Sequence, residues 1–551
     1  MGFCMKGKKV DISKPRKATK SKRSPYWKYG LVFLIILLAA LIRLRLLGCP
    51  LERDEGEYAY AGQLILQGIP PYQLAYNMKL PGTYAAYALI MAIFGQTPNA
   101  IHIGLLLINA SSALLIYFLG ARLFGTSAGL VACASFVFLS VGQSVLGTAA
   151  HATHFVILPA LGGTLLLLKA IEQRRTSTFL WSGLLFGLAF VMKQPGIFFV
   201  VFAMLYYSWC EWRARPVNWR SLAARGGLLS LGALMPFGLT CLMLRAAGVI
   251  ERFWFWTFSY AREYATNLTV SQGIQKFSAM APKIVDSFVL IWVIAGVGLV
   301  ALICDRKARE KIPFLLGLLL FSFLAVCSGF YFRQHYFILM LPAVALLAGF
   351  AVSFMEQYFQ RTGSLVFVPL LAFIAALGFS ISQQSAFLFE MDPVGACRAM
   401  YGLNPFPESL EIAKYLQDHT SAAGRVAILG SEPQIYFHSR RHSATGYIYT
   451  YGLMEEQKYA LRMQKEMISE IEKARPEYAV VVNVPSSWLL QANSETAIFT
   501  WANQYLQNQY TLDGIVDILS EDQTVYRWGD EAIDYQPRSP INLSIYKRKS
   551  L

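Results

Sequence analysis

Long apolar runs separated by short polar segments dominate the pattern of hydrophobic and polar residues along this chain. A helix needs about 20 apolar residues to cross the roughly 30 Å hydrocarbon core of a bilayer. The pattern therefore predicts a polytopic α-helical membrane protein with about eleven spans. The runs that cross, or nearly cross, such a core lie near residues 29–47, 99–120, 127–147, 155–169, 178–192, 196–210, 225–249, 285–304, 313–331, 336–355 and 364–381.

Composition agrees with this pattern, and the distribution of charge orients it. The 551 residues are 55% hydrophobic and 15% charged, which excludes a single soluble core. Much of the net charge of +16 comes from a basic arm, residues 1–28, that holds ten Lys or Arg against one acid. Such an arm before an apolar run marks the cytoplasmic side and contacts anionic lipid. Because no aromatic residues alternate with these charges, we expect membrane lipids and no nucleic acid as partners.

The run over 178–210 can be read as one very long helix or as two short helices broken at Lys193-Gln194-Pro195-Gly196. With a break, the basic loop 213–220 lies on the side of the N-terminal arm. Without it, that loop moves to the opposite side, against the rule that positive loops stay inside. The charges therefore predict two helices, with Lys193 at the outer mouth of the turn.

This topology places four connecting segments on the outer face, at 48–98, 148–154, 250–284 and 332–335. The first of them is too long for a simple connector. It contains helical patterns over 54–67 and 81–94, which we expect to lie along the membrane surface.

The chain changes character after about residue 382, where strand-like runs at 425–430 and 478–483 alternate with helical patterns at 407–419 and 455–474. Alternation of this kind predicts a soluble α/β domain, placed outside by the topology. We expect three parts: a cytoplasmic arm over 1–28, a transmembrane domain over 29–381 and an extracytoplasmic domain over 382–551.

Four carboxylates, including Asp54, Glu55 and Glu57, directly follow the first apolar run. On a helix, Asp54, Glu57 and Tyr58 share one face, and Glu55 points about a quarter turn away. A carboxylate at the edge of lipid has a raised pKa unless a cation or hydrogen-bond donor opposes the effect, which suits a general base. The alternative is that the four acids only solvate an interfacial helix.

Several cations reach the same outer level from distant parts of the chain. Lys79, Lys193 and Arg333 lie there, with His335 and Tyr336 beside them. Cations at this depth suit the phosphate or pyrophosphate of a lipid, where they stabilise the charge that grows on a leaving group. The alternative is that each cation reaches the lipid headgroups on its own, which we expect for Arg43 and Arg45.

Metal ligation is only weakly indicated. His151 and His154 share a helix face, but a metal site needs three or four ligands, so we expect them to line the outer cavity. Because side-chain cations already supply positive charge, we expect no metal and no cofactor. The cysteines show no metal spacing, and only Cys49 and Cys397 lie where an oxidising compartment would pair them, which the sequence leaves open.

Four stretches then resemble a known family when taken in order. They are DEGEYAYAGQLILQGIPPY after the first span, MKLPGTY, GLAFVMKQPGIFF and a late HYFILMLPAVALLAG. Together they resemble bacterial membrane glycosyltransferases of the GT-C superfamily, in the dolichyl-phosphate-mannose protein mannosyltransferase-like family. That family also includes the aminoarabinose transferases that modify lipid A. The resemblance covers roughly residues 29–381.

The resemblance implies an inverting sugar transferase of the plasma (inner) membrane that uses a polyprenyl-phosphate-linked monosaccharide on the outer face. It matches Asp54 to the catalytic aspartate, Glu55 to its acidic neighbour, and Lys79 to a lysine that contacts the donor phosphate. Tyr58 matches a tyrosine one turn on.

His335 and Tyr336 match a motif that faces the same cavity. The chain departs from the family at His154, where many relatives carry an acid. This departure puts a second carboxylate from that loop in doubt.

The function expected from these features is transfer of the sugar to a hydroxyl, with Asp54 as general base and Lys79, Lys193 and Arg333 around the leaving phosphate. The acceptor, whether protein, lipid or glycan, is left open. A transporter or flippase of a lipid-linked sugar is the first alternative, and a scaffold that presents the C-terminal domain is the second.

Overall fold

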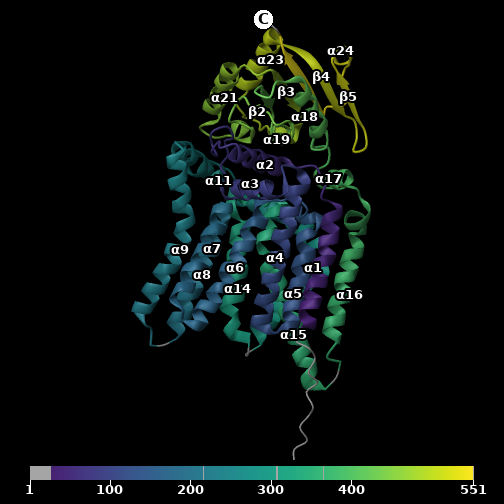
Figure 1. The fold of residues 1–551 in the computed structure, drawn as a ribbon. Coiled ribbons are helices and arrows are strands. Elements are labelled where there is room, and N and C mark those ends of the chain that lie inside the picture. The colour runs from purple at the N-terminus through teal and green to yellow at the C-terminus, as the bar shows by residue number, and fades with distance from the viewer. Residues whose placement is uncertain (1–25, 215, 306–307, 364, 550–551) are drawn as a thin grey trace, which may run out of the picture.

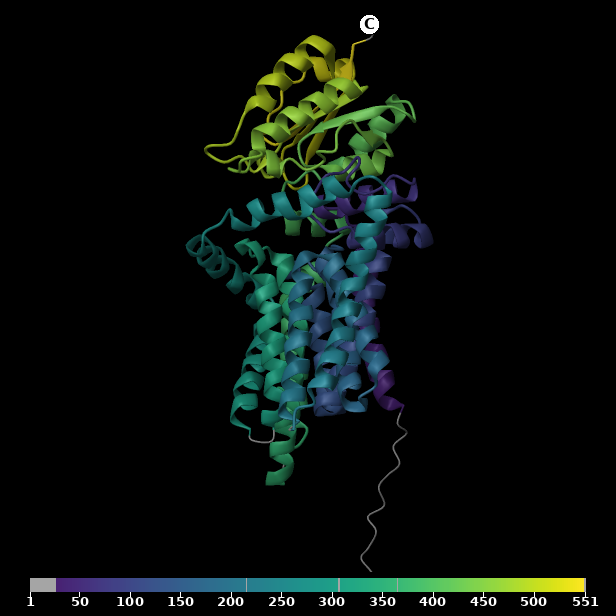
Figure 2. The same ribbon diagram turned by 90° about the vertical axis from the view of Figure 1, so that its left-hand side faces the viewer.

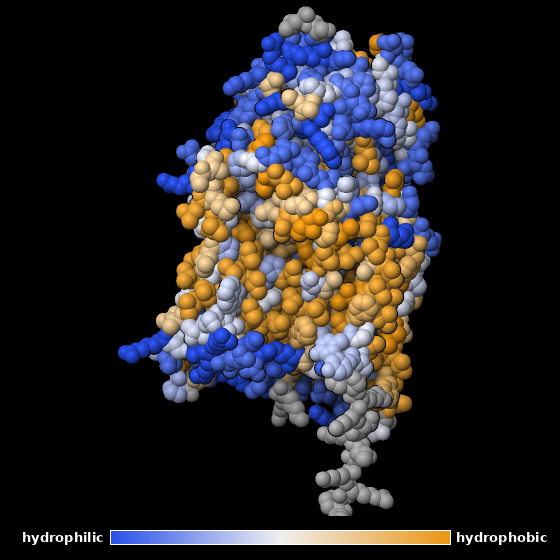
Figure 3. All heavy atoms as spheres, viewed as in Figure 1, coloured by the Kyte–Doolittle hydropathy of each residue, from blue (hydrophilic) through white to orange (hydrophobic). Residues whose placement is uncertain are grey.

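The computed structural model describes residues 26–549 except 215, 306–307 and 364, so most of the basic arm lies outside the described residues. A bundle of helices carries a sheet domain on one end, with α2 and α3 between the two (Figure 1). The surface of the bundle is a hydrophobic band, whereas the domain and the opposite end are hydrophilic (Figure 3). The expected class, a polytopic helical membrane protein with a C-terminal sheet domain, is confirmed.

A helix lies at every one of the eleven expected positions. By length and composition, only five helices in the described ranges can each cross a membrane, or six if the bent pair α12–α13 is one crossing. The expected eleven full crossings are too many, because the other helices have 15–17 residues and reach only about 23–26 Å. The eleven are α1 (Trp27–Arg45), α4 (Pro98–Phe124), α5 (Thr126–Val141), α6 (Ala152–Gln173), α7 (Thr176–Met192), α8 (Ile197–Arg213), α9 (Trp219–Ala246), α13 (Val289–Cys304), α14 (Ile312–Val326), α15 (Leu341–Thr362) and α16 (Val368–Gln383).

The predicted break in the run over 178–210 is confirmed. Helix α7 ends at Met192, the short helix η2 (Gln194–Gly196) turns the chain, and α8 begins at Ile197. Lys193 has an extended backbone between them. The turn therefore holds Lys193 at the end of the bundle that carries the C-terminal domain.

The segment that follows α9 runs along the junction between the bundle and the domain (Figure 2). Its aromatic residues mostly pack inward, because Phe253 is fully buried and Trp256 is stacked on Tyr76. Other rings of the segment face outward, such as Trp254, which is 52% exposed. The segment consists of α10 (Ile250–Trp254), η3 (Phe255–Tyr260), α11 (Ala261–Thr266) and α12 (Val270–Asp286).

The C-terminal domain contains one six-stranded mixed sheet in the order β2-β1-β3-β6-β4-β5. Strands β1, β2 and β3 are parallel, whereas β6, β4 and β5 are antiparallel. The parallel half matches the expected strand–helix alternation, and the antiparallel half was not expected. The strands are β1 (Arg425–Leu429), β2 (His442–Ser443), β3 (Tyr478–Asn483), β4 (Tyr510–Ile518), β5 (Thr524–Trp528) and β6 (Asn542–Arg548).

The remaining helices connect these parts. Cys49 and Cys397 lie in one buried cluster with Phe406, where α1 leads out of the bundle and α17 leads into the domain, and both are free thiols. The remaining elements are α17 (Pro393–Tyr401), α18 (Glu408–His419), α19 (Pro433–Ser439), α20 (Tyr451–Met454), α21 (Ala460–Ala474), α22 (Pro485–Trp488), α23 (Ala497–Gln509) and α24 (Asp530–Ile533), with short turns η1 (Gln143–Val145), η4 (Ala308–Lys311), η5 (Ser328–Phe330), η6 (Gln334–Met340) and η7 (Ala386–Glu390).

Helix α2 (Arg53–Leu66) joins the domain to the bundle, with α3 (Gly82–Phe94) beside it. A Cβ atom on Gly56 would lie 2.6 Å from the Gln434 backbone nitrogen, so glycine lets α2 and α19 approach closely. Arg53 forms a 2.6 Å ion pair with Glu432 of the domain, and both side chains are buried. The domain is thus fixed to the helix that bears the acidic cluster.

Removing one partner of that ion pair tests this attachment. We expect Glu432→Gln to lower the free energy of unfolding by about 3–5 kcal/mol, because Arg53 would keep a buried charge without a counterion. Thermal unfolding of the purified protein measures the loss. Glu531→Gln is the matched control, since its pair with Arg527 is exposed. Equal melting of the two variants would contradict a structural role for the buried pair.

Candidate active site

A cavity of about 240 Å³ lies where the bundle, α2 and the C-terminal domain meet. Six separate parts of the chain line it, including the start of α2, the turn at Lys193 and a loop of the domain around Tyr449. The lining residues are Asp54, Tyr76, Asn77, Met78, Lys79, Lys193, Gln194, Pro195, Trp256, Tyr260, Ala261, Tyr264, Ala265, Ser328, Gly329, Arg333, His335, Tyr336, Tyr449, Tyr451, Gly452 and Glu455.

Asp54 lies in the first turn of α2, where the helix dipole favours a negative charge. Its Oδ1 atom accepts hydrogen bonds from Lys79 Nζ at 2.8 Å and from the Tyr449 hydroxyl at 2.9 Å. Burial acts to raise the pKa of Asp54, but Lys79 outweighs it and holds that pKa well below its usual value. The expected opposing cation is therefore present, and Asp54 is ionised at neutral pH.

Lys79 also forms an ion pair with Glu57, at 2.7 Å, and its ammonium group lies 4.6 Å from the centre of the Tyr58 ring. Glu57 is completely buried and accepts further hydrogen bonds from Asn77 and Tyr84. Asp54, Glu57 and Tyr58 thus share one face, as predicted. Glu57 and Tyr58 support Lys79 from behind and do not line the cavity.

Glu55 points away from the cavity, a quarter turn from Asp54. Its carboxylate caps its own helix together with Glu52 and accepts hydrogen bonds from His102 at 3.0 Å and from the Ala150 amide at 2.6 Å. These contacts hold the loop that leads to His151. In this structure Glu55 thus holds a loop beside the cavity, and its expected catalytic role stays a prediction.

The two arginines at the end of α1 donate hydrogen bonds to backbone carbonyl oxygens of the protein. Arg43 is buried and donates to the carbonyl oxygens of Gly147 and Ser140 at 2.7 and 2.9 Å. Arg45 donates to carbonyl oxygens near Leu388, close to the start of the domain. The expectation that both reach the lipid headgroups on their own is wrong, because backbone carbonyl oxygens of the protein accept their hydrogen bonds. Arg43 thus supports the same loop that Glu55 holds.

Lys193 and Arg333 are the cavity cations without a carboxylate partner among the residues that the structure describes. Lys193 Nζ lies 4.2 Å from the centre of the Tyr336 ring, and the Arg333 guanidinium lies 6.0 Å from that of Tyr451. Burial lowers the pKa of Lys193 to about 7. Both residues are partly buried, and a cation withdrawn from water without a counterion is costly, so this pair favours an anionic ligand.

The backbone next to Arg333 is strained. Phe330 and Phe332 have φ values of 58° and 46°, in the left-handed region that residues with a Cβ seldom adopt. Strain of this kind persists where the surrounding structure imposes it, and it is common at binding sites. Here it directs the 328–336 segment, with Arg333 and His335, along the cavity wall.

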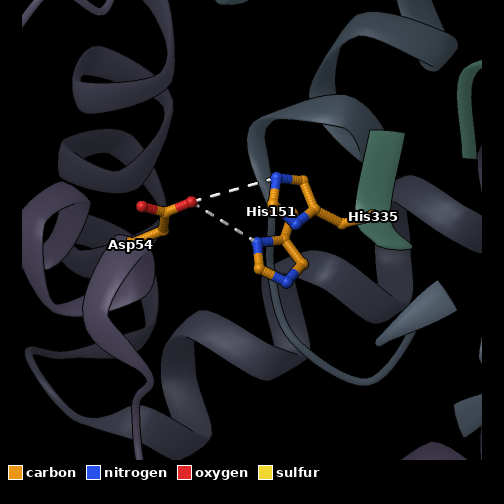
Figure 4. Close-up of side chains that lie close together, drawn as sticks. All are labelled: Asp54, His151 and His335. Carbon is orange, nitrogen blue, oxygen red and sulfur yellow. Dashed lines mark ion pairs between the residues drawn. The ribbon is translucent and has the colours of Figure 1, made fainter. Parts of the chain in front are cut away.

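His151 and His335 face the second oxygen of Asp54 (Figure 4). Asp54 Oδ2 lies 4.0 Å from His151 Nδ1 and 3.9 Å from His335 Nε2, and the ligand atoms of these three residues lie within 4.8 Å of one another. Burial lowers the pKa of His151 to about 4, so its ring is neutral. Both of its ring nitrogens are buried without a hydrogen-bond partner among the described residues.

These three residues have the donor types of a zinc site but not its geometry. The imidazole rings are stacked, with centres 4.0 Å apart and planes inclined by 13°. An imidazole lone pair lies in the plane of its ring, and one ion cannot lie in two nearly parallel planes. The residues do not fit a metal ion in this arrangement, and we derive no step through one.

The structure does not bring every candidate to the cavity. His154 lies buried in α6 and is not among the lining residues. In contrast, the domain supplies Tyr449, Tyr451 and Glu455, which the sequence analysis did not single out. No motif marks these residues, and only their position after a predicted strand could have suggested a loop near the membrane.

Residues 79–239 match the sequence profile of the dolichyl-phosphate-mannose-protein mannosyltransferase family, and this range contains both Lys79 and Lys193. No curated protein sequence matches the chain. The profile therefore rests on the central part of the transmembrane region, which includes two of the cavity cations.

Solved structures show the same fold over nearly the whole chain. ArnT from Cupriavidus metallidurans bound to undecaprenyl phosphate superimposes with a TM-score of 0.58 at 13% identity, covering 95% of this chain and 98% of ArnT. Archaeal oligosaccharyltransferase AglB from Archaeoglobus fulgidus, in complex with an inhibitory peptide and a dolichol-phosphate, gives 0.51 at 11% identity, covering 94% and 75%. Residues 79–239 are thus similar to the dolichyl-phosphate-mannose-protein mannosyltransferase family, and the chain has the fold of ArnT and AglB.

Proposed function

We propose that this protein transfers a monosaccharide from a polyprenyl-phosphate donor to an acceptor hydroxyl at the outer face of the membrane, with inversion. One observation carries the proposal: two partly buried cations without a carboxylate partner in the described ranges, Lys193 and Arg333, share a cavity with the ionised Asp54. Structures of two relatives with this fold hold undecaprenyl phosphate and dolichol-phosphate, which supports a lipid phosphate as the anion.

The reaction breaks the bond between the sugar C1 atom and the phosphate oxygen, and the acceptor oxygen bonds to C1 from the opposite side. Lys193 and Arg333 stabilise the charge that grows on the departing lipid phosphate. That phosphate is a good leaving group, so the mechanism needs no general acid. The transition state resembles an oxocarbenium ion, as in sugar transfer generally.

Asp54 accepts the proton of the acceptor through Oδ2, since Lys79 and Tyr449 already occupy Oδ1. A carboxylate with a low pKa is a weak base toward a neutral alcohol. Proton transfer therefore follows the start of C–O bond formation, when the attacking oxygen has become positively charged and acidic. Lys79 holds Asp54 ionised and correctly oriented for this step, and its third N–H can reach the donor phosphate.

The location of the cavity favours this enzyme over a transporter or flippase. A transporter is expected to place its charged groups near the middle of the membrane. Here the charged groups gather where the helices meet the C-terminal domain. On the proposed topology this junction is the outer face, where a lipid-linked sugar and a soluble or lipid acceptor can meet.

Purified protein in lipid nanodiscs, given a labelled polyprenyl-phosphate hexose and an extract of acceptors, tests the function. The expected products are free polyprenyl phosphate and a glycoside of inverted configuration. Movement of the intact donor across vesicle membranes, without release of the lipid phosphate, would support the transporter instead.

The pKa of Lys193 predicts how binding depends on pH. Lys193 is protonated below about pH 7 and loses its charge as the pH rises through that value. A polyprenyl phosphate methyl ester is a suitable probe, because it keeps one negative charge over this range and carries no sugar. We expect its affinity to fall between pH 6 and pH 8.5, and to fall less in Lys193→Arg, whose guanidinium remains charged. The remaining fall in that variant comes from Glu455, whose pKa is also about 7 and which becomes negative over the same range. A parallel fall in both proteins would contradict this role for Lys193.

A further inference from the structure

The C-terminal domain supplies one wall of the cavity, and Glu455 is the charged residue of that wall. Glu455 follows α20, is 8% exposed and lines the cavity together with Tyr449, Tyr451 and Gly452. Its Oε2 atom accepts a 2.7 Å hydrogen bond from the Tyr260 hydroxyl. Within the described part of the chain, that is the one hydrogen bond to its carboxylate, so Oε1 keeps its full capacity to accept others.

Asp54 and Glu455 are the two carboxylates of the cavity lining, and they differ in how many of their oxygen atoms are free to bind a ligand. Asp54 is engaged by Lys79 and Tyr449, whereas Glu455 forms no ion pair among the described residues. Burial raises the pKa of Glu455 to about 7, against the opposing effects of Tyr260 and Arg333. Hydrogen-bond donors from a ligand would favour its charged form and offset the cost of burying it.

Aromatic rings surround this carboxylate. Trp256 and Tyr260 pack edge to face with centres 5.2 Å apart, and both line the cavity near Glu455. The other aromatic residues of the lining are Tyr76, Tyr264, Tyr336, Tyr449 and Tyr451. A largely apolar pocket with a few directed polar groups is typical of specific small-molecule sites. Apolar ring faces with one carboxylate at the edge suit a sugar, which presents C–H faces and hydroxyl edges.

The charges of the cavity assign the two parts of the donor to different residues. Lys79 already forms ion pairs with Asp54 and with the buried Glu57. Lys193 and Arg333 have no carboxylate partner among the described residues, so the donor phosphate is best placed beside them. Glu455 is then the carboxylate that remains for the sugar.

We propose that Glu455 determines the sugar specificity of this enzyme by accepting hydrogen bonds from hydroxyl groups of the donor monosaccharide. The inference rests on the proposed function, and it assigns part of the donor site to the C-terminal domain. A site built to bind hydroxyl groups rejects analogues that lack them far more strongly than an apolar pocket does.

The test uses the full-length protein in nanodiscs and two kinds of probe. The first is sugar-free polyprenyl phosphate methyl ester, and the second is a set of polyprenyl-phosphate sugars: glucose, galactose, mannose and one amino sugar. We expect Glu455→Gln to bind the sugar-free ester as the unmodified protein does, but to bind the preferred hexose donor at least about tenfold more weakly, since a hydrogen bond to a charged group contributes about 1.5–3 kcal/mol. Glu455→Asp should restore part of the preference, and KM should change more than kcat.

The adjacent Glu456→Gln is the matched control, because Glu456 is exposed and does not line the cavity. An unchanged hexose preference in Glu455→Gln would overturn the inference alone. Equal loss of affinity for the sugar-free ester would also overturn it, since Glu455 would then act on the phosphate site. Failure of the unmodified protein to bind any lipid phosphate would overturn the proposed function as well.

Discussion

Replacing Asp54 by asparagine should lower the rate of sugar transfer by about 10²–10⁴-fold, the usual contribution of a general base. Asparagine keeps the size of the side chain and an oxygen near Lys79 Nζ, but it cannot take up the proton of the acceptor. Donor binding should be retained, because the cations proposed to hold the phosphate are Lys193 and Arg333. Transfer kinetics with labelled donor, together with donor affinity measured separately, check both parts.

The pattern of the loss distinguishes chemistry from folding. We expect kcat to fall while the melting temperature stays within a few degrees, since Lys79 keeps its ion pair with Glu57. Asp418→Asn on the exposed surface of the domain is the matched control and should transfer sugar normally. Near-normal turnover in Asp54→Asn would remove Asp54 as the base.

Neutralising the two unpaired cations should abolish donor binding. We expect Lys193→Gln and Arg333→Gln each to weaken affinity for a polyprenyl-phosphate sugar by about 10- to 150-fold, because a hydrogen bond to a charged group contributes about 1.5–3 kcal/mol. The double variant should bind too weakly for turnover at ordinary donor concentrations. Direct binding in nanodiscs measures all three.

The same two substitutions, Lys193→Gln and Arg333→Gln, should weaken donor binding without lowering the stability of the ligand-free protein. A partly buried cation without a counterion opposes folding, so its replacement by glutamine should leave the melting temperature of the ligand-free protein unchanged or raise it. Lys276→Gln is the control, an exposed cation of the 250–284 segment that is expected to change neither quantity. Loss of stability together with binding would mean that Lys193 and Arg333 hold the fold and not a ligand.

Local periodicity accounts for the part of this site that sequence could predict. The three- and four-residue spacing placed Asp54, Glu57 and Tyr58 on one face and turned Glu55 away, as the structure has them. Charge placement located the turn at Lys193, since only a break there keeps the basic loops on one side. Both arguments depend on neighbours in the chain, whose geometry a helix or a turn fixes.

Contacts between segments that are distant in the sequence could not be predicted from periodicity or from loop charge. The hydrogen bonds from Arg43 to the Gly147 and Ser140 carbonyls, and the role of Glu55 in holding that loop, depend on how α1, α2 and α5 pack. The contribution of Glu455 depends on how the domain sits over the bundle, which no residue pattern encodes. The antiparallel half of the sheet was also missed, because Asp513, Gly514 and Asp517 interrupt the apolar pattern of β4.

The central claim is that a lipid-linked anion binds between Lys193 and Arg333 with its sugar toward Asp54. A structure of the Asp54→Asn variant with a bound polyprenyl-phosphate hexose tests it most directly, since this variant should hold the donor without consuming it. The account predicts phosphate oxygens within hydrogen-bond distance of both cations and the sugar C1 atom facing residue 54. A phosphate bound elsewhere, or a sugar on the far side of the phosphate from residue 54, would contradict it.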